Sequence, residues 1–265
     1  MTKIAVIIPY LNFPEKLKAS VESIQEDGGS QIDLVIVDDG SQDKLKLEEI
    51  NNYPYGKIKL ISFSKNKGVN FARNAALKWI LSKEKYEMIG FLDAGDFCLP
   101  NRFKIQIEYL KNHPKTKLVG SQVNYVDMNR KYLYTTKLPC TYDELKNKFY
   151  LNSLIYQPSA MLKTEVVAQI GYYPTEYKIA TDYGYFFKII KKFKVENINT
   201  PLIDYVVDEN SISTKKRKKQ VKTRIRIILK HFYFGFYPIY GLLRNILLLF
   251  VSRRISTAIK KILYR

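Results

Sequence analysis

Four short apolar segments alternate with helix-like segments in the first 112 residues, and this alternation limits the fold more than any other feature of the chain. The apolar segments cover residues 3–9, 32–38, 57–63 and 88–93. Apolar residues recur in the stretches between and after them at the spacing of one helix face. Strands that alternate with crossover helices form a mostly parallel sheet flanked by helices. The sequence therefore predicts an α/β fold with a Rossmann-like sheet.

The pattern is looser after residue 115, and we divide the chain there into two halves, 1–112 and 113–213. The second half still predicts several strands and an amphipathic helix. We expect strands at 118–126, 131–136, 158–163 and 201–207, and the helix at 180–193.

Charge is segregated along the chain. The formal net charge is +19, and the last acidic residue is Glu209. Residues 210–265 contain 15 Lys and Arg and no Asp or Glu, whereas residues 1–209 carry a net charge of only +4. The first four-fifths therefore has the composition of an ordinary globular domain. We expect residues 214–265 to form a basic, amphipathic helical tail.

The cysteine content and the N-terminal residues favour a cytoplasmic location. Cys98 and Cys140 are too few for a disulfide framework or a thiolate zinc site. The first ten residues, MTKIAVIIPY, lack the long apolar stretch and the small-residue cleavage site of a signal peptide. We therefore expect a reducing compartment.

Polar side chains follow each of the first four expected strands, where ligands bind in open α/β sheets. Taken one at a time, these residues also fit turns, helix caps and solvated surface positions. Together they place acids, amides and bases on one rim of one sheet. The residues concerned are Pro9, Tyr10, Asn12, Asp38, Asp39, Asn66, Lys67, Gly68, Arg73, Asp93 and Asp96.

This rim has the groups that a nucleotide diphosphate needs. Asp39 can accept a hydrogen bond from the imide N–H of a pyrimidine base or from ribose hydroxyls. Arg73 can neutralise a phosphate or stack beside a base. Asp93 and Asp96 can hold a hard divalent cation, which in turn holds a diphosphate. The sequence therefore predicts a site for a nucleotide diphosphate.

Five motifs in order resemble one known family. They are VIIPYLN, VDDGS, NKGVNFARN, FLDAGDFCLPNRF and the stretch from QPSAMLK to ATDYGYFFKI. Over about residues 1–213 the sequence is similar to the inverting family 2 glycosyltransferases of the GT-A fold. The resemblance implies that a sugar moves from a nucleotide-sugar, a UDP-sugar first of all, to a glycan. It also implies a bacterial type of acceptor, which is lipid-linked or belongs to lipopolysaccharide.

The resemblance also implies roles for individual residues. Asp39 would contact the base with Asp38 beside it, and Arg73 matches the arginine of the third motif. Asp182 would be the general base that takes the proton of the acceptor hydroxyl. Asp93 and Asp96 would ligate Mn²⁺ or Mg²⁺, which absorbs the charge of the leaving nucleoside diphosphate. Residues 1–112 would then bind the nucleotide, and residues 113–213 the acceptor.

Two positions depart from the family pattern. Gly95 stands where the family usually has an acid as its main metal ligand, and Asp208 stands where it often has a histidine. Asp208 fits two interpretations equally, an oxygen ligand for the metal or a surface residue. Asp182 also fits a simple electrostatic role, since an acid in the first turn of a helix is favoured by the helix dipole.

The tail predicts a membrane surface as a partner. Its longest stretch without a basic residue, 232–243, has 12 residues and contains Gly235 and Pro238, whereas a transmembrane helix needs about 20. We therefore expect one or two helices that lie on anionic lipid at the inner face of the cell membrane. The expected lipid contacts are Lys215, Lys216, Arg217, Lys218, Lys219, Arg253 and Arg254, with Phe232, Tyr233, Phe236 and Tyr237 inserted.

Several alternatives stay open. The tail could instead form a homodimer, or the basic run 215–219 could bind nucleic acid, although we expect no nucleic-acid partner. A sugar-1-phosphate nucleotidylyltransferase would need a glycine-rich loop after the first strand, where this chain has PYLN. A non-catalytic membrane- or nucleic-acid-binding adaptor with a decayed site is the second hypothesis, because Gly95 removes an expected ligand.

Overall fold

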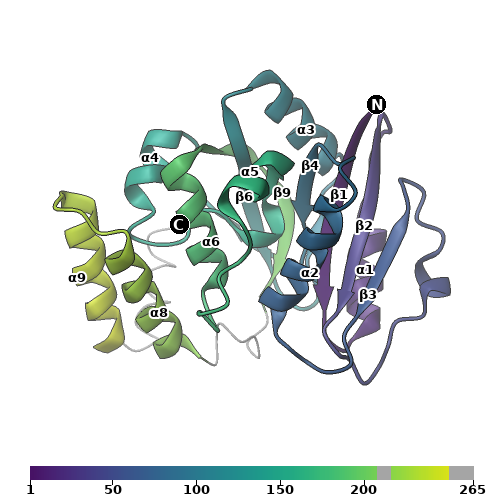
Figure 1. Cartoon of the computed structure of the whole chain (residues 1–265), viewed down its shortest axis with the longest axis horizontal. Helices are drawn as coiled ribbons and strands as arrows, with labels where there is room; N and C mark the ends of the chain where they lie inside the picture. Colours follow the sequence, from purple (N-terminus) through teal and green to yellow (C-terminus); the bar gives the residue numbers. More distant parts are fainter. Residues whose placement is uncertain (208–215, 251–265) are drawn as a thin grey trace.

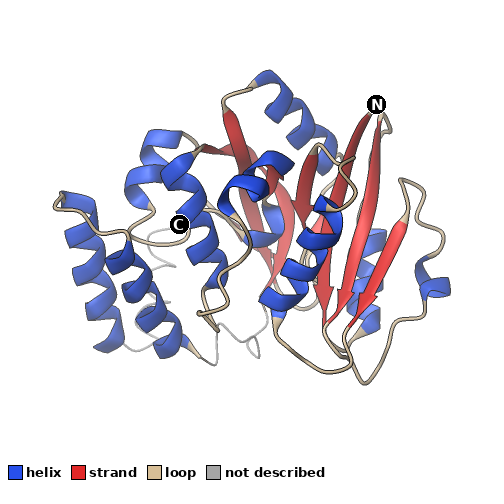
Figure 2. Cartoon of the chain, in the orientation of Figure 1, coloured by secondary structure: helices blue, strands red, loops and turns tan. Residues whose placement is uncertain are grey.

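Nine strands form one sheet in the computed structural model, which describes residues 1–207 and 216–250 (Figures 1 and 2). The strands are β1 (Thr2–Tyr10), β2 (Ser30–Asp38), β3 (Ile58–Ser62), β4 (Met88–Phe91), β5 (Phe97–Cys98), β6 (Thr116–Val126), β7 (Tyr132–Thr135), β8 (Met161–Lys163) and β9 (Lys194–Val206). The helices are α1 (Pro14–Glu22), α2 (Val69–Leu81), α3 (Arg102–Asn112), α4 (Tyr142–Lys148), α5 (Thr164–Ile170), α6 (Thr181–Lys192), α8 (Arg217–Lys230) and α9 (Phe236–Phe250), with 3₁₀ turns η1 (Leu47–Ile50) and η2 (Gln157–Ser159).

The predicted α/β class is confirmed, but the sheet is mixed rather than mostly parallel. The strand order is β3-β2-β1-β4-β8-β6-β9-β5, and β7 pairs with β6. β1 to β4 are parallel to one another, whereas β8 runs antiparallel to both β4 and β6. An apolar run predicts a strand but not its direction, which depends on how the connecting chain crosses the sheet.

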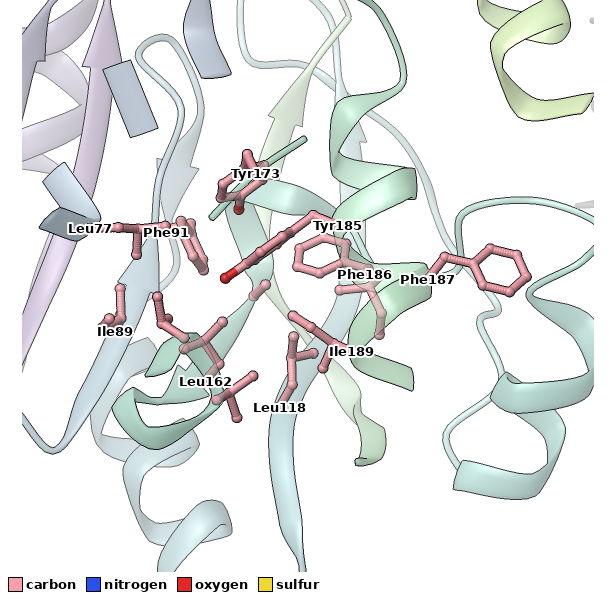
Figure 3. Close-up of a cluster of buried hydrophobic side chains, with 14 of the residues drawn as sticks. Leu77, Ile89, Phe91, Leu118, Leu162, Tyr173, Tyr185, Phe186, Phe187 and Ile189 are labelled. Atoms are coloured by element: carbon pink, nitrogen blue, oxygen red, sulfur yellow. The ribbon is translucent and has the colours of Figure 1, made fainter. Parts of the chain in front are cut away.

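Helices cover both faces of the sheet, and β1 explains why its sequence is apolar throughout. Ala5 and Ile7 of β1 pack in the cluster that includes α2, α5 and α6, while Ile4 and Val6 pack on the opposite face against α1 and α3. A strand buried on both faces needs an uninterrupted apolar run. Figure 3 shows the first cluster, in which Tyr185 of α6 lies among residues from β4, β6 and β8.

Where elements differ from the sequence expectation, the cause is local. The stretch between β2 and β3 that has helical spacing forms only the short turn η1, and Leu45 and Ile50 are the only buried apolar residues of 43–52. The last expected strand begins earlier, at Lys194. Its first part is polar, and Asn197 is buried there because its Nδ2 donates a hydrogen bond to Pro139 O at 2.9 Å.

The expected tail helices are present as α8 and α9, which pack on the rest of the chain (Figure 1). Ile227 and Ile228 of α8 belong to the buried cluster around α6. In α9, Gly241 lies so close to the backbone of Tyr150 that a Cβ would collide with the Tyr150 carbonyl oxygen. Among the described residues, no helix is long and apolar enough to cross a membrane.

Candidate active site

The loops after β1 and β2 are tied together by their own polar side chains. Tyr10 and Asp38 are register partners at the carboxyl ends of the two strands. Asp38 Oδ1 accepts a hydrogen bond from Ser41 N at 2.8 Å, and the Tyr10 hydroxyl accepts one from Leu45 N at 3.1 Å. Asn12 Oδ1 accepts one from the backbone of the same β2 loop at 3.0 Å. Three of the expected rim residues, Tyr10, Asn12 and Asp38, therefore fix the backbone of the loop after β2.

Asp39 holds the loop that follows β3. Its carboxylate is buried and accepts hydrogen bonds from the backbone N–H groups of Lys67 at 2.8 Å and Gly68 at 2.9 Å. Gly40 permits this close approach, because its φ is +79° and a Cβ there would overlap the backbone of Lys65. Each oxygen of Asp39 keeps a second lone pair, so the carboxylate can still accept a hydrogen bond from a base or a ribose.

Arg73 and Asp93 form a partly buried ion pair at the centre of the rim. Arg73 Nη2 lies 2.7 Å from Asp93 Oδ1, and the guanidinium lies over the ring of Tyr173, 5.6 Å from its centroid. Burial lowers the pKa of Arg73, but Asp93, Tyr173 and Asp182 outweigh it, so the pKa is raised. Nε of Arg73 is buried without a hydrogen-bond partner. The guanidinium therefore keeps a donor for a further acceptor group.

Asp96 is buried beside the last strand of the sheet. Its Oδ1 accepts a hydrogen bond from Val206 N at 3.0 Å, and burial together with the charge of Asp93 raises the pKa of Asp96 well above its ordinary value. Gly95 has a φ of +101°, and an added Cβ would meet the Lys16 side chain at 3.7 Å. A pocket of about 320 Å³ opens at this turn, and Lys16, Gly95 and Asp96 are among its lining residues.

Asp182 lies in the first turn of α6, directly after a strained stretch of backbone. Ala180 has a φ of +56°, a left-handed conformation that costs a non-glycine residue about 1–2 kcal/mol. Such strain persists where the surrounding structure imposes it, which is often at functional sites. Burial, Asp96, Asp93 and, to a smaller extent, Asp182 raise the pKa of Tyr205. All three acids therefore lie within electrostatic reach of one tyrosine.

Comparison with known proteins identifies the family. A profile described as "Glycosyl transferase family 2" matches residues 5–171. The chain belongs to glycosyl transferase family 2. It is 30% identical over 221 residues to an uncharacterized glycosyltransferase of Methanocaldococcus jannaschii, covering 82% of this chain and 75% of the relative. It is 24% identical over 220 residues to the Escherichia coli UDP-Glc:alpha-D-GlcNAc-diphosphoundecaprenol beta-1,3-glucosyltransferase WfgD, covering 82% and 81%.

Solved structures agree with the GT-A fold. S. aureus TarS 1–349 aligns with a TM-score of 0.65 at 19% identity, over 92% of this chain and 71% of that chain. The mannosyltransferase PcManGT from Pyrobaculum calidifontis aligns with a TM-score of 0.64 at 18% identity, over 94% and 70%. The predicted fold and family are thus confirmed.

The acids of this family 2 chain fit a divalent cation that the substrate helps to hold. Asp96 lines the 320 Å³ pocket, and Asp93 lies three residues earlier in an ion pair with Arg73, so the two residues would offer hard oxygen donors. Mg²⁺ is commonly bound through one or two carboxylates together with substrate phosphates and water. No three His, Cys, Asp or Glu side chains come together as a metal-binding group within 1–207 and 216–250. The third expected ligand, Asp208, lies outside the described residues.

The structure brings most of the expected site residues together and adds two that the sequence analysis did not select. Pro9 is buried within β1, opposite Val37. Tyr173, under the Arg73 guanidinium, and Arg224 of α8, within electrostatic reach of Asp182, are the additions. The spacing in α8 could have indicated Arg224, because it shares a helix face with the buried residues Val221 and Ile228.

Proposed function

We propose that this glycosyltransferase moves a sugar from a nucleotide-diphosphate sugar, a UDP-sugar first of all, to a hydroxyl of a lipid-linked or lipopolysaccharide glycan. The observation that carries the proposal is the position of Arg73. It forms an ion pair with Asp93, the expected donor-side acid. The pKa of Arg73 is raised: burial is the largest single effect and lowers it, but nearby groups, among them Asp182, together outweigh burial. Donor and acceptor groups could therefore meet over one guanidinium.

The names of similar proteins support this choice of substrates. WfgD is named for a UDP-Glc donor and a diphosphoundecaprenol-linked acceptor. TarS has been solved in complex with UDP-GlcNAc, and PcManGT with GDP-Man and Mn²⁺.

The proposed reaction inverts the anomeric centre in a single displacement. The acceptor oxygen attacks the anomeric carbon while the bond from that carbon to the diphosphate oxygen breaks, and the diphosphate leaves with the electron pair. Asp182 takes the proton of the acceptor hydroxyl, which is a poor nucleophile otherwise. Asp93 and Asp96 would hold Mn²⁺ or Mg²⁺, which neutralises charge on the leaving diphosphate.

A panel of UDP-, GDP- and dTDP-sugars tests the proposal, with release of the nucleoside diphosphate measured without a metal, with Mn²⁺ and with Mg²⁺. We expect the purified chain to hydrolyse at least one donor slowly, and only when the metal is present. A chain that neither binds nor hydrolyses any of these donors with either metal would instead favour the non-catalytic adaptor.

We also propose that α9 places the enzyme on the inner face of the cell membrane. Five large apolar residues recur at spacings of four and three along its exposed face, from Phe236, 73% exposed, to Phe250, 83% exposed. The other three are Tyr240, Leu243 and Leu247. The neighbouring helix α8 has a basic exposed face of Lys218, Lys219, Lys222, Arg226 and Lys230. Such a pairing of apolar and basic faces suits an anionic lipid surface.

The geometry changes the list of expected lipid contacts. Tyr237 is partly buried against the core, so we leave it out of the proposed membrane face. Tyr233 packs edge-to-face on Tyr150 at 5.7 Å but is still 44% exposed, so we keep it. Phe236 is kept, and Phe232 packs against the exposed ring of Phe234. Lys215, Arg253 and Arg254 lie outside the described residues.

A further inference from the structure

Helix α8 of the tail packs on α6, the helix whose first turn carries the expected catalytic base. Asp182 and Gly184 lie in the first turn of α6, and a Cβ at Gly184 would meet Ile227 Cδ1 of α8 at 3.4 Å. Further along the two helices, the ring of Phe187 stacks on His231, with centroids 4.6 Å apart. These contacts place α8 alongside α6 (Figure 1).

Arg224 lies on the packed side of α8, and its Nε donor has no hydrogen-bond acceptor. It shares a helix face with Val221 and Ile228, which are both buried. Its Nε is buried and has no hydrogen-bond partner, and no hydrogen bond or ion pair joins Arg224 to any residue of the described ranges. A buried guanidinium donor that lacks an acceptor is costly, so we expect a water, an ion or a ligand to satisfy this group.

The charges around Arg224 leave it short of negative charge. Burial has the largest effect on the pKa of Arg224 and lowers it; Tyr183 and Asp182 raise this pKa by smaller amounts, and Arg244 lowers it by an amount that is smaller still. Arg244 comes from α9 and donates a hydrogen bond to Leu151 O at 2.7 Å. Arg224 therefore has one carboxylate, Asp182, and one further guanidinium, Arg244, within electrostatic reach, so two positive charges stand against one negative charge and an anion would be stabilised here.

We propose that Arg224 binds a phosphate group of the acceptor, next to the hydroxyl that Asp182 deprotonates. This inference rests on the proposed transferase function. Arginine matches the geometry of phosphate through paired N–H donors.

The order of the helices gives the acceptor a direction. α8 lies between α6, which carries Asp182, and α9, which carries the exposed apolar face. In an acceptor whose phosphate links a sugar to a lipid, the sugar would lie at α6, the phosphate at α8 and the lipid at α9.

The test is a titration of the full chain with two probes, farnesyl diphosphate and inorganic pyrophosphate. Saturating UDP and Mg²⁺ are present so that the donor site is filled, and binding is measured by calorimetry. We compare the wild type with Arg224→Gln and with Lys111→Gln, because Lys111 is an exposed base on α3, which packs on the opposite face of the sheet from α6. Arg224→Gln should weaken binding at least about tenfold, while Lys111→Gln should stay within about twofold of the wild type.

The two probes distinguish the sources of the phosphate. Arg224-dependent binding of farnesyl diphosphate alone, or more tightly than pyrophosphate, supports a lipid-linked acceptor. Equal or better binding of pyrophosphate supports a water-soluble phosphorylated glycan. Wild-type affinity in Arg224→Gln, or no binding of either probe by the wild type, overturns the proposal.

Two controls separate this result from others. Arg224→Lys keeps the charge and replaces the test if the glutamine variant does not melt cooperatively; it should still lose affinity, because Lys cannot form the paired contact. UDP-sugar hydrolysis by the wild-type chain is measured in parallel. If hydrolysis occurs and the phosphate inference fails, the proposed function stands; if no donor is bound or hydrolysed, the proposed function fails first.

Discussion

At the scale of single residues, most acids at the rim have a structural partner as well as an expected ligand. Asp38 and Asp39 fix the backbone of the loops around them, and Asp93 fixes the guanidinium of Arg73. A side chain that is already held in place loses little freedom when a ligand binds. This part of the rim is therefore preorganised before the substrate binds.

Asp93→Asn tests the metal assignment. The change removes one negative charge but keeps the shape of the side chain. The Mn²⁺-dependent part of UDP affinity should therefore fall at least about tenfold, which is the loss typical of changes to groups that support a metal site. Calorimetric titration of UDP with and without Mn²⁺ measures it. The matched control is Asp43→Asn, an exposed acid in the loop after β2, which should bind like the wild type. An unchanged metal dependence in Asp93→Asn would remove Asp93 from the metal site.

At the scale of elements, the helix pair α8–α9 is held by a few specific contacts. The Tyr150 hydroxyl donates to His231 O at 2.8 Å, and the His231 ring stacks on Phe187. Burial together with Lys191 and Lys230 lowers the pKa of His231 to about 4. The folded state therefore keeps this ring neutral.

His231→Phe should make stability less sensitive to acid. In the wild type, the unfolded chain takes up a proton at His231 below pH 6.5, whereas the folded chain does so only below about 4. The stability that the neutral ring provides is complete above pH 6.5 and is lost as the pH falls toward 4. The phenylalanine variant keeps the ring stack and lacks this term. Between pH 6.5 and pH 4 the melting temperature should fall less for the variant than for the wild type. If the two curves of melting temperature against pH are parallel, the role of His231 is refuted.

The sequence predicted the elements whose residues are apolar and missed those whose residues are polar. β1 and β2 were expected close to their observed bounds, because each buries a continuous apolar run. Helix α4 was not expected, since Leu145 is its only buried residue. The first part of β9 was also missed, because buried hydrogen-bonded side chains such as Asn197 replace apolar ones there.

The candidate site divides in the same way. Asp39, Arg73, Asp93 and Asp182 were predicted, because strand ends meet at one edge and because motifs marked them. Arg224 was not, since it comes from a helix that the sequence treated as an appendage. Only the packing of α8 on α6 brings it near Asp182.

At the scale of the whole molecule, catalysis and membrane binding are proposed for adjoining surfaces. The apolar face of α9 is continuous from Phe236 to Phe250, and Arg244, the one charged residue of this helix, is turned toward Leu151. A second copy of the same chain would bring two basic α8 faces together, which like-charge repulsion opposes. We therefore propose anionic lipid, rather than a second copy of the chain, as the partner of this face.

Leu243→Ser/Leu247→Ser tests the membrane face. Burial of one leucine contributes about 1.5–3 kcal/mol, so the double variant should bind anionic vesicles at least about tenfold more weakly in a sedimentation assay. The wild type should bind and be partly released by salt. Tyr132→Ser/Leu133→Ser, which alters two exposed residues of β7, is the control and should sediment normally. Normal sedimentation of the α9 variant would exclude this face.

The central claim is that the rim is a transferase site with Asp182 as its base, and Asp182→Asn measures it most directly. The substitution keeps the size of the side chain and removes its ability to accept a proton. With the donor and acceptor found by the panel, we predict that transfer falls at least about 100-fold, while UDP affinity stays within about twofold of the wild type. Near-normal transfer by this variant would contradict the account.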